Sequence, residues 1–456
     1  MPAPTACLPP IAELRRRLSA AGAHAELIDG VLTAARAPAA EHVFIGAPFD
    51  AGARAAACAA DALLAAGRAA TSLGPLAGLP VTVKDLFDVA GQLTLAGSRL
   101  RRDAPRATRD AAAVARLRAA GAAIVGRTNM TEFGYSGVGI NPHHGTPRNP
   151  CDDDIVRIPG GSSSGAAVSV ALGLAVAGLG TDTGGSIRIP AALTGIVGFK
   201  NTQRRTPATG AFPLSFTLDT VCSMSRSVAD CLLVDGVLAG APLAVRRREA
   251  ADLVLALPRT LMLDDLERPV AAAFARALAA LGRAGARIVE LPFGEFGELA
   301  AVTAPAGFSA VEAWATHREA MSTRRAEFDP RVAQRIAPGE GVSAADYIRM
   351  HERRRDWIGR VSAHFEGIDA LVCPTVPMVA PALAPLVESD ELFFEANGLL
   401  LRNTWPINLL DGCAFSLPCQ APGELPVGLM LAAPGGRDAE LAAVALAVEA
   451  LLARSA

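Results

Sequence analysis

The sequence predicts one α/β domain, and three observations indicate this fold class. Short β-favouring runs alternate with segments whose apolar residues have helical spacing, a pattern typical of α/β proteins. One unit of helix, glycine and strand occurs once in each half of the chain. No low-complexity linker divides the 456 residues, so the sequence does not indicate two separate domains.

The first expected elements are helices, followed by a strand. Residues 1–70 are rich in alanine with helix-compatible spacing, as in 11–18 and 53–66, which predicts helices packed on the outside of the domain. A β-favouring run at 80–83 stops at a charged pair that begins with Lys84. Enzymes of the α/β class often keep their chemistry at such strand ends.

The repeated unit predicts two further helix and strand pairs. The first helix is expected to begin at Asp110 as its N-cap and to stop at Gly121, before a buried strand over 122–125. The second unit has its glycine stop at Gly285 and a buried strand at 288–289. Because nothing recurs at a fixed period, we interpret the units as two uses of one packing pattern.

The remaining segments include an ordered loop and a buried core. Residues 141–161 are rich in Pro, Gly, Asn and Asp, which predicts a loop. The most apolar stretch, 166–180, is shorter than the roughly 20 residues of a membrane span, so we predict a buried helix that runs into a buried strand. A polar helical region at 330–360 and a strand at 370–372 follow.

Charge and cysteine usage exclude several classes of partner. The formal net charge is −2, from 43 basic and 45 acidic residues, so no long-range field attracts nucleic acid or an anionic membrane. The eight cysteines form no C-x-x-C pair, which favours reduced thiols over a disulfide framework or a zinc site. Residues 1–18 lack the apolar region of a signal peptide. We therefore expect a cytoplasmic protein without a nucleic-acid or membrane partner.

Two glycine-rich segments, 160–165 and 181–186, carry serines. Glycines permit backbone conformations closed to other residues and let a substrate approach closely. Consecutive backbone N–H groups in such turns can converge on a developing oxyanion. Both segments therefore suit a nucleophilic serine.

A serine hydroxyl needs a base to take its proton. None of the seven histidines lies in a segment that looks built around a catalytic imidazole. Only Lys84 and Lys200 are lysines, and a desolvated ammonium can release a proton that a guanidinium keeps. Composition alone leaves open whether Lys84 is the base or a residual lysine, and we interpret Lys200 as structural.

At this point the residues resemble the amidase signature family. The match covers nearly the whole chain from about residue 70, in the order of the family, although Ser164 stands where the family usually has glycine. The segments that carry the resemblance are 84–88, 128–133, 141–150, 160–165, 180–190, 195–200, 373–375 and 425–429.

The resemblance implies a fold and a subdivision of the chain. The expected fold is a single domain with a central mixed, twisted, largely parallel-containing β-sheet that is covered by helices on both faces. Within the domain 1–456, residues 1–70 form an N-terminal helical segment, 71–225 the signature core with the catalytic residues, and 226–456 the rest of the sheet and the loops of the substrate pocket.

The resemblance also implies a Ser-Ser-Lys triad. Ser186 is the expected nucleophile, Ser162 the bridging serine and Lys84 the base, kept neutral by burial. The peptide bond between Gly161 and Ser162 is expected to be cis. The substrate-binding residues are the oxyanion donors, with Gly134 on the opposite wall of the site; the donors are the backbone N–H groups of Thr183, Gly184, Gly185 and Ser186.

The implied activity is hydrolysis of a small-molecule carboxylic amide to a carboxylate and ammonia or an amine, through an acyl-enzyme on Ser186. No cofactor and no metal are implied, and a homodimer is possible. Asp182 and Arg188 are expected to pair and brace the nucleophile loop. Substrate contacts are expected from loops near 133–135, 304–317 and 403–415, while Trp314, Tyr347 and Trp405 border the pocket or pack in the core.

Two other functions remain open. The A subunit of glutamyl-tRNA amidotransferase belongs to the same family and releases ammonia from glutamine within a complex. Residues 161–165 also match the G-x-S-x-G elbow of α/β-hydrolases, with Ser163 as the nucleophile. That elbow requires a strand directly before it, whereas a loop with three aspartates precedes Ser163. We interpret those aspartates, 152–154, and the histidines 143–144 as solvated or hydrogen-bonded groups rather than metal ligands.

Overall fold

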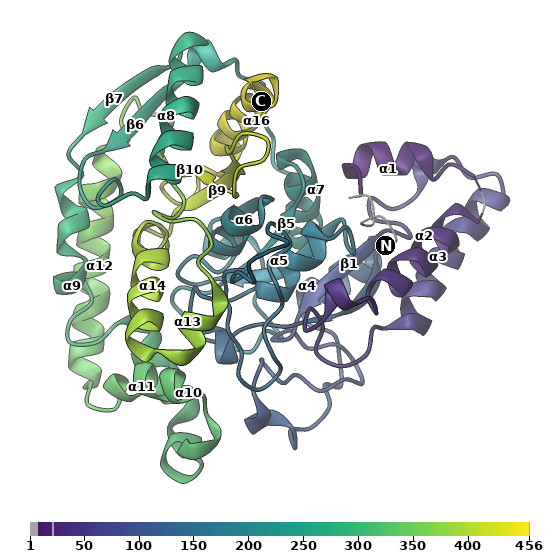
Figure 1. Cartoon of the computed structure of the whole chain (residues 1–456), viewed down its shortest axis with the longest axis horizontal. Helices are drawn as coiled ribbons and strands as arrows, with labels where there is room; N and C mark the ends of the chain where they lie inside the picture. Colours follow the sequence, from purple (N-terminus) through teal and green to yellow (C-terminus); the bar gives the residue numbers. More distant parts are fainter. Residues whose placement is uncertain (1–7, 21, 456) are drawn as a thin grey trace.

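The computed structural model describes residues 8–20 and 22–455, and a ten-stranded sheet runs through the molecule (Figure 1). The order of the strands is β2-β1-β3-β5-β4-β9-β10-β8-β6-β7. Their bounds are β1 Pro80–Lys84, β2 Ala123–Thr128, β3 Ala177–Asp182, β4 Val197–Lys200, β5 Thr220–Ser225, β6 Val254–Pro258, β7 Arg287–Leu291, β8 Ala370–Pro374, β9 Cys413–Pro418 and β10 Gly428–Ala433.

The sheet is mixed, with parallel pairing at its two ends. Strand β1 pairs in parallel with β2 and β3, and β6 pairs in parallel with β7 and β8. The strands between these two groups, from β3 through β5, β4, β9 and β10 to β8, pair antiparallel. The predicted mixed sheet is therefore confirmed, and its parallel strands form two separate groups.

Helices surround the sheet. Their bounds are α1 Ile11–Arg17, α2 Ala23–Ala34, α3 Asp50–Ala65, α4 Ala112–Ala119, α5 Ser164–Ala171, α6 Arg188–Thr194, α7 Val228–Ala239, α8 Arg268–Arg283, α9 Leu299–Val302, α10 Phe308–Thr323, α11 Pro330–Ile336, α12 Ala344–Ala363, α13 Leu383–Glu388, α14 Asp390–Arg402, α15 Trp405–Leu409 and α16 Asp438–Ser455.

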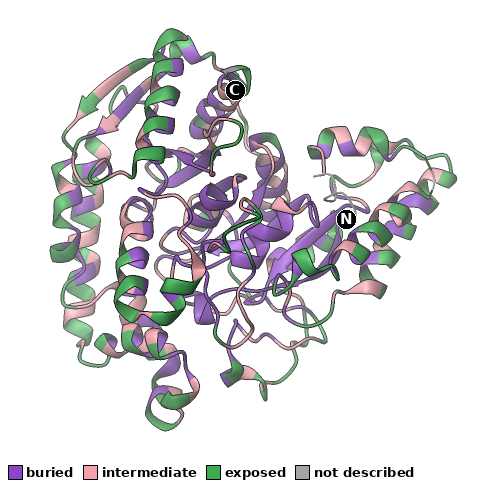
Figure 2. Cartoon of the chain, in the orientation of Figure 1, coloured by how far each residue is buried: buried purple, intermediate pink, exposed green. Residues whose placement is uncertain are grey.

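Alternate residues of β10 show that helices cover both faces. Leu429 and Leu431 lie in a core cluster with residues of α7, α8 and α16. Met430 and Ala432 lie in another cluster with residues of α9 and α12. Because successive side chains of a strand point to opposite faces, the two clusters lie on opposite sides of the sheet. The sheet therefore has an apolar core on each side. Figure 2 shows that its central strands are buried.

Most of the elements expected from the sequence are present. The predicted helices at 11–18 and 53–66 correspond to α1 and α3, and α3 packs its alanines against β2. The stretch 166–180 forms α5 and then β3, both buried. The polar region 330–360 forms α11 and α12. The first seven residues of the predicted 1–70 segment lie outside the described residues, and the subdivision of the domain stays a prediction.

Two details of the repeated unit were predicted wrongly. Helix α4 begins at Ala112, and Asp110 does not cap it, because its carboxylate accepts hydrogen bonds from the backbone of Ala90 and the side chain of Arg118, both at 2.8 Å. The second strand of the unit, β7, is only partly buried because it lies at the edge of the sheet. The two glycine stops, Gly121 and Gly285, have the expected positive φ of 86° and 93°.

None of the described helices combines the length and the apolar character needed to cross a membrane. The cysteines that the structure describes are all free, and Cys7 lies outside the described residues.

Candidate active site

Lys84 lies at the end of β1, between β2 and β3, and its side chain is fully buried. Its Nζ is 2.8 Å from Ser162 Oγ and 3.0 Å from Thr181 Oγ1. The next residue, Asp85, points elsewhere, because its carboxylate pairs with Arg127 at 2.7 Å. Among the described residues, the Lys84 amine therefore contacts two hydroxyls, those of Ser162 and Thr181, and no carboxylate.

Burial changes the protonation of this amine. Removal from water lowers the pKa of Lys84 to about 7, against the opposing charges of Asp219, Cys222 and Asp182. Burial disfavours the charged form of a lysine because the ammonium loses its hydration. Close to neutral pH, a large fraction of Lys84 is therefore the free amine, which can accept a proton.

Ser162 lies on the loop before α5. The Gly161–Ser162 peptide bond is cis, as the family resemblance implied. Gly161 packs so closely on Gly139 that an added Cβ would lie 2.8 Å from the Gly139 backbone nitrogen, which explains the glycine. The Ser163 N–H donates to the Ser186 carbonyl at 3.3 Å, so the two serine-bearing loops contact each other.

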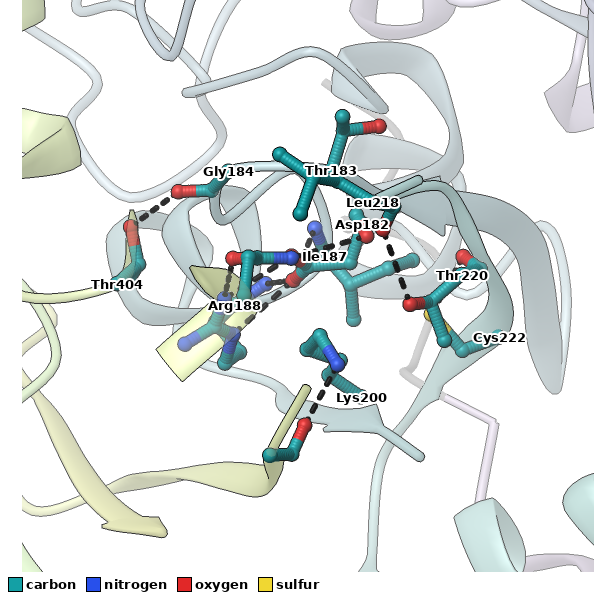
Figure 3. Close-up of polar contacts among 12 residues, drawn as sticks. Asp182, Thr183, Gly184, Ile187, Arg188, Lys200, Leu218, Thr220, Cys222 and Thr404 are labelled. Carbon is teal, nitrogen blue, oxygen red and sulfur yellow. Dashed lines mark hydrogen bonds and ion pairs between the residues drawn. The ribbon is translucent and has the colours of Figure 1, made fainter. Parts of the chain in front are cut away.

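Ser186 lies on the loop between β3 and α6. Thr404 donates a hydrogen bond to the Gly184 carbonyl at 2.6 Å, and an added Cβ on Gly185 would lie 2.2 Å from the Thr404 hydroxyl (Figure 3). Gly185 also has φ of 135°, a conformation that favours glycine. Among the described residues, the backbone N–H groups of 183–186 have no acceptor within the protein.

A buried ion pair between Asp182 and Arg188 holds this loop in place. Arg188 donates two hydrogen bonds of 3.0 Å to Asp182 (Figure 3). Asn408 donates another to Asp182 at 2.9 Å. Although burial raises the pKa of Asp182, the charge of Arg188 and these hydrogen bonds hold it at about 2. The predicted pairing of Asp182 with Arg188 is confirmed. A bidentate arginine contact fixes orientation as well as charge.

A cavity of about 600 Å³ opens above the loop. Ser186, Thr183, Gly184 and Gly134 line it, and a Cβ added to Gly134 would lie 3.8 Å from Ser162 Oγ. Ser162 and Lys84 are buried and are not among the lining residues. The other residues that line the cavity are Tyr135, Ser136, Leu214, Ala306, Gly307, Phe308, Ser309, Ala310, Gln334, Arg335, Pro338, Phe394, Gly398, Leu401, Arg402 and Trp405.

The sequence predicted part of this lining. The loops near 133–135 and 304–317 contribute to the cavity, whereas the segment 403–415 contributes only Trp405. Sequence reasoning missed the residues of 334–338 and 394–402. No local motif marks those segments, since they belong to helices whose apolar spacing indicates only a packed face.

The residues weighed as an alternative nucleophile or as metal ligands form contacts with other parts of the protein. Ser163 is buried, is not among the cavity residues, and its hydroxyl faces the Thr181 carbonyl at 3.4 Å. His143 contacts Glu132 at 2.8 Å, and Asp152 pairs with Arg157 at 2.7 Å. The described part of the chain contains no group of three His, Cys, Asp or Glu side chains that could hold a metal ion.

Comparisons with known proteins show the family of this chain. The family model described as Amidase matches residues 38–442. The chain is 38% identical over 410 residues to 2-amino-5-chloromuconic acid deaminase of Comamonas testosteroni, covering 88% of this chain and 86% of that protein. It is 34% identical over 419 residues to the A subunit of the glutamyl-tRNA(Gln) amidotransferase of Symbiobacterium thermophilum, covering 83% and 84%. A crystal structure of an amidase matches with a TM-score of 0.85 and 32% identity, covering 97% of this chain and 99% of that one.

Proposed function

This chain belongs to the amidase family and is an amide-hydrolysing enzyme, and we propose that hydrolysis proceeds through an acyl-enzyme on Ser186. In this proposal Ser162 relays the proton and Lys84 is the base. The observation that carries it is the buried 2.8 Å contact between Lys84 Nζ and Ser162 Oγ, on a loop whose next residue, Ser163, donates a hydrogen bond to the Ser186 carbonyl.

The proton path starts with a neutral Lys84. The amine takes a proton from the Ser162 hydroxyl, which in turn takes the proton of Ser186 as Ser186 Oγ attacks the amide carbonyl carbon. Burial supports this role, because it lowers the pKa of Lys84 to about 7. A charged lysine in the same place could not accept the proton.

The tetrahedral oxyanion would be bound by the backbone N–H groups of the nucleophile loop. Those groups, from residues 183–186, have no acceptor within the described protein, and Thr183, Gly184 and Ser186 line the cavity. Fixed donors of this kind stabilise the transition state without reorganising during the reaction, and each contributes about 2.7–4 kcal/mol. The braced, glycine-rich loop supports this role for them.

Collapse of the tetrahedral species breaks the C–N bond. The proton held on Lys84 returns through Ser162 to the leaving nitrogen, which departs as ammonia or an amine. A water molecule then attacks the acyl-enzyme by the same proton route and releases the carboxylate, with Ser186 regenerated. No step requires a cofactor or a metal.

The second candidate is the A subunit of a glutamyl-tRNA amidotransferase, since a protein of that name is 34% identical to this chain. Size-exclusion chromatography of the purified chain, combined with glutaminase and simple-amide assays, separates the two functions. A free-standing hydrolase turns over simple amides without partner chains. An amidotransferase component would release ammonia from glutamine only after its complex is reconstituted.

The acyl-enzyme can be tested directly. Intact-mass spectrometry after rapid quenching should detect an acyl group on the wild type, and peptide mapping should locate it on Ser186. The substrate panel should contain primary amides, anilides and glutamine. Ser186→Ala should lose the adduct, whereas Ser163→Ala should keep it; the reverse result would establish the elbow serine as the nucleophile.

Assembly and location are further proposals. We propose a cytoplasmic enzyme, because the described cysteines are free thiols. The homodimer remains a prediction that light scattering of the purified chain tests.

A further inference from the structure

The catalytic cavity contains two arginines that the mechanism does not use. Arg335 comes from α11 and Arg402 from the last turn of α14, and both line the cavity with Ser186. They are the charged side chains among its lining residues, and no acidic side chain of the described chain belongs to that lining. The walls of the cavity are thus positively charged and lack a counter-ion.

Both guanidinium groups have hydrogen-bonding capacity that the protein leaves unused. Arg335 Nη1 and Arg402 Nη2 are buried atoms without a hydrogen-bond partner among the described residues. A buried donor without an acceptor is unfavourable and rare in folded proteins. Arg331 lies on the same helix as Arg335 but differs from it, because the Arg331 guanidinium pairs with Asp390 at 2.6 Å.

The surroundings of the two arginines support the same conclusion. Burial lowers the pKa of Arg335, and this is opposed by Tyr135, whose ring centroid lies 5.0 Å from the guanidinium carbon. Burial also lowers the pKa of Arg402, with Asp264 and Asp265 opposing it from a distance, without forming an ion pair. Each charge is therefore poorly solvated and unpaired, which an anionic ligand would relieve.

Two acidic groups next to the cavity lining, Asp219 and Glu312, are already bound by other residues. Asp219 accepts hydrogen bonds from Thr183 at 2.6 Å and from two backbone N–H groups. Glu312 accepts from Ser215, Thr217 and Tyr347. Neither carboxylate lines the cavity, so neither is in position to neutralise the two arginines.

We propose that Arg335 and Arg402 bind a carboxylate of the substrate, so that this amidase acts on amides that also carry an acid group. The inference rests on the proposed function, because the amide must reach Ser186 in the same cavity. Guanidinium groups match carboxylates in charge and in fork geometry. The apolar wall, which includes Phe308, Phe394 and Leu401, would contact the carbon chain between the acid and the amide.

The carboxylate could lie on the acyl side or on the amine side of the scissile bond. Monoamides of malonic, succinic and glutaric acid place it on the acyl side, and N-acylglycines place it on the amine side. Each acid is compared with a neutral partner of equal length, the diamide or the N-acylglycine amide. In at least one of these two series we expect kcat/KM for the acid to exceed that for its neutral partner by at least tenfold.

Two variants test the arginines themselves. In Arg335→Gln and Arg402→Gln, the ratio of kcat/KM for the acid to that for its neutral partner should fall at least tenfold, and Arg→Lys at each position should restore part of it. The matched control is Arg349→Gln, at an exposed position of α12, which should keep the wild-type ratio. Thermal unfolding of each variant checks that the protein is folded.

Two results would overturn the inference. One is a wild type without preference for the acid in either series, and the other is an equal loss on the acid and its neutral partner in both glutamine variants. If the wild type hydrolyses no amide at all, the proposed function fails separately. Calorimetric titration with succinate and glutarate then still tests the anion site, with at least tenfold weaker binding expected for Arg335→Gln.

Discussion

The two lysines of this chain occupy similar positions and have different partners. Lys84 ends β1, Lys200 ends β4, and both are buried, so burial lowers the pKa of each. Lys84 Nζ contacts the hydroxyls of Ser162 and Thr181. Lys200 Nζ instead contacts two backbone carbonyls, those of Gly412 at 2.6 Å and Asn201 at 3.2 Å.

The difference teaches that burial alone does not make a lysine a base. A hydroxyl can donate its proton to a free amine, whereas a carbonyl can only accept a hydrogen bond. Lys200 also lies near Asp182, whose charge opposes the lowering of its pKa. The same charge opposes the lowering of the pKa of Lys84, so the difference lies in the hydrogen-bond partners. The carbonyl partners of Lys200 suit a structural lysine, as the sequence predicted, whereas the hydroxyl partners of Lys84 suit proton transfer.

The largest expected effect separates the two lysines by activity. Lys84→Met should lower kcat/KM by about 10³-fold or more, as removal of a residue from a catalytic triad does. Lys200→Met should stay within about tenfold of the wild type, because its carbonyl partners have no proton to transfer. Steady-state kinetics on the best amide of the panel measures both. Equal losses of kcat/KM in the two variants would contradict the different roles that we give to Lys84 and Lys200.

The charge of Asp182 opposes the lowering of the pKa of both lysines. Its ion pair with Arg188 can be tested by measuring the stability of the fold. Asp182→Asn leaves the buried Arg188 guanidinium without its charged partner, which should lower the free energy of unfolding by about 3–5 kcal/mol. Urea denaturation followed by circular dichroism measures this change. The surface pair of Arg247 and Glu249 is the control, because Glu249→Gln should change the free energy by less than about 1 kcal/mol.

The structural role of Lys200 predicts a smaller loss of stability. Lys200→Met leaves the Gly412 and Asn201 carbonyls without their donor, and an unpaired buried group of this kind costs about 1–3 kcal/mol. The unfolding midpoint in urea should therefore fall while activity is largely retained. Unchanged stability would show that these two contacts contribute nothing.

The pH dependence of the reaction tests the free amine at Lys84. Its pKa is about 7, so the neutral form dominates above pH 7 and is lost below it. In the range where Lys84 titrates, kcat/KM should fall tenfold for each pH unit below about 7 and level off above it. A profile that stays flat from about pH 5 to pH 8 would rule out this base.

The smallest expected effect concerns the Thr181 hydroxyl, the second hydroxyl that contacts the Lys84 amine. Thr181→Val removes a contact of 3.0 Å but keeps the shape of the side chain. Loss of one neutral hydrogen bond that orients the amine should lower kcat/KM by about 2–10-fold. A loss as large as that of Lys84→Met would show that Thr181, rather than Ser162, carries the proton.

Local patterns in the sequence determined much of this protein. The run that ends at Lys84, the two serine-bearing glycine segments and the helix and strand over 166–180 were all predictable, because each depends on neighbouring residues. The resemblance added the cis peptide at Ser162, which the structure contains. The assignment of the triad followed from the same motifs and stays a prediction.

Only the tertiary structure decided the rest. Arg335 and Arg402 meet Ser186 across about 150 and 215 residues of chain, and nothing local distinguishes them from the other arginines. Asp110 satisfies its hydrogen bonds elsewhere, and β7 is only partly buried because no strand pairs beyond it in the described sheet. Periodicity and capping rules describe neighbours along the chain, whereas burial and charge pairing depend on segments that folding brings together.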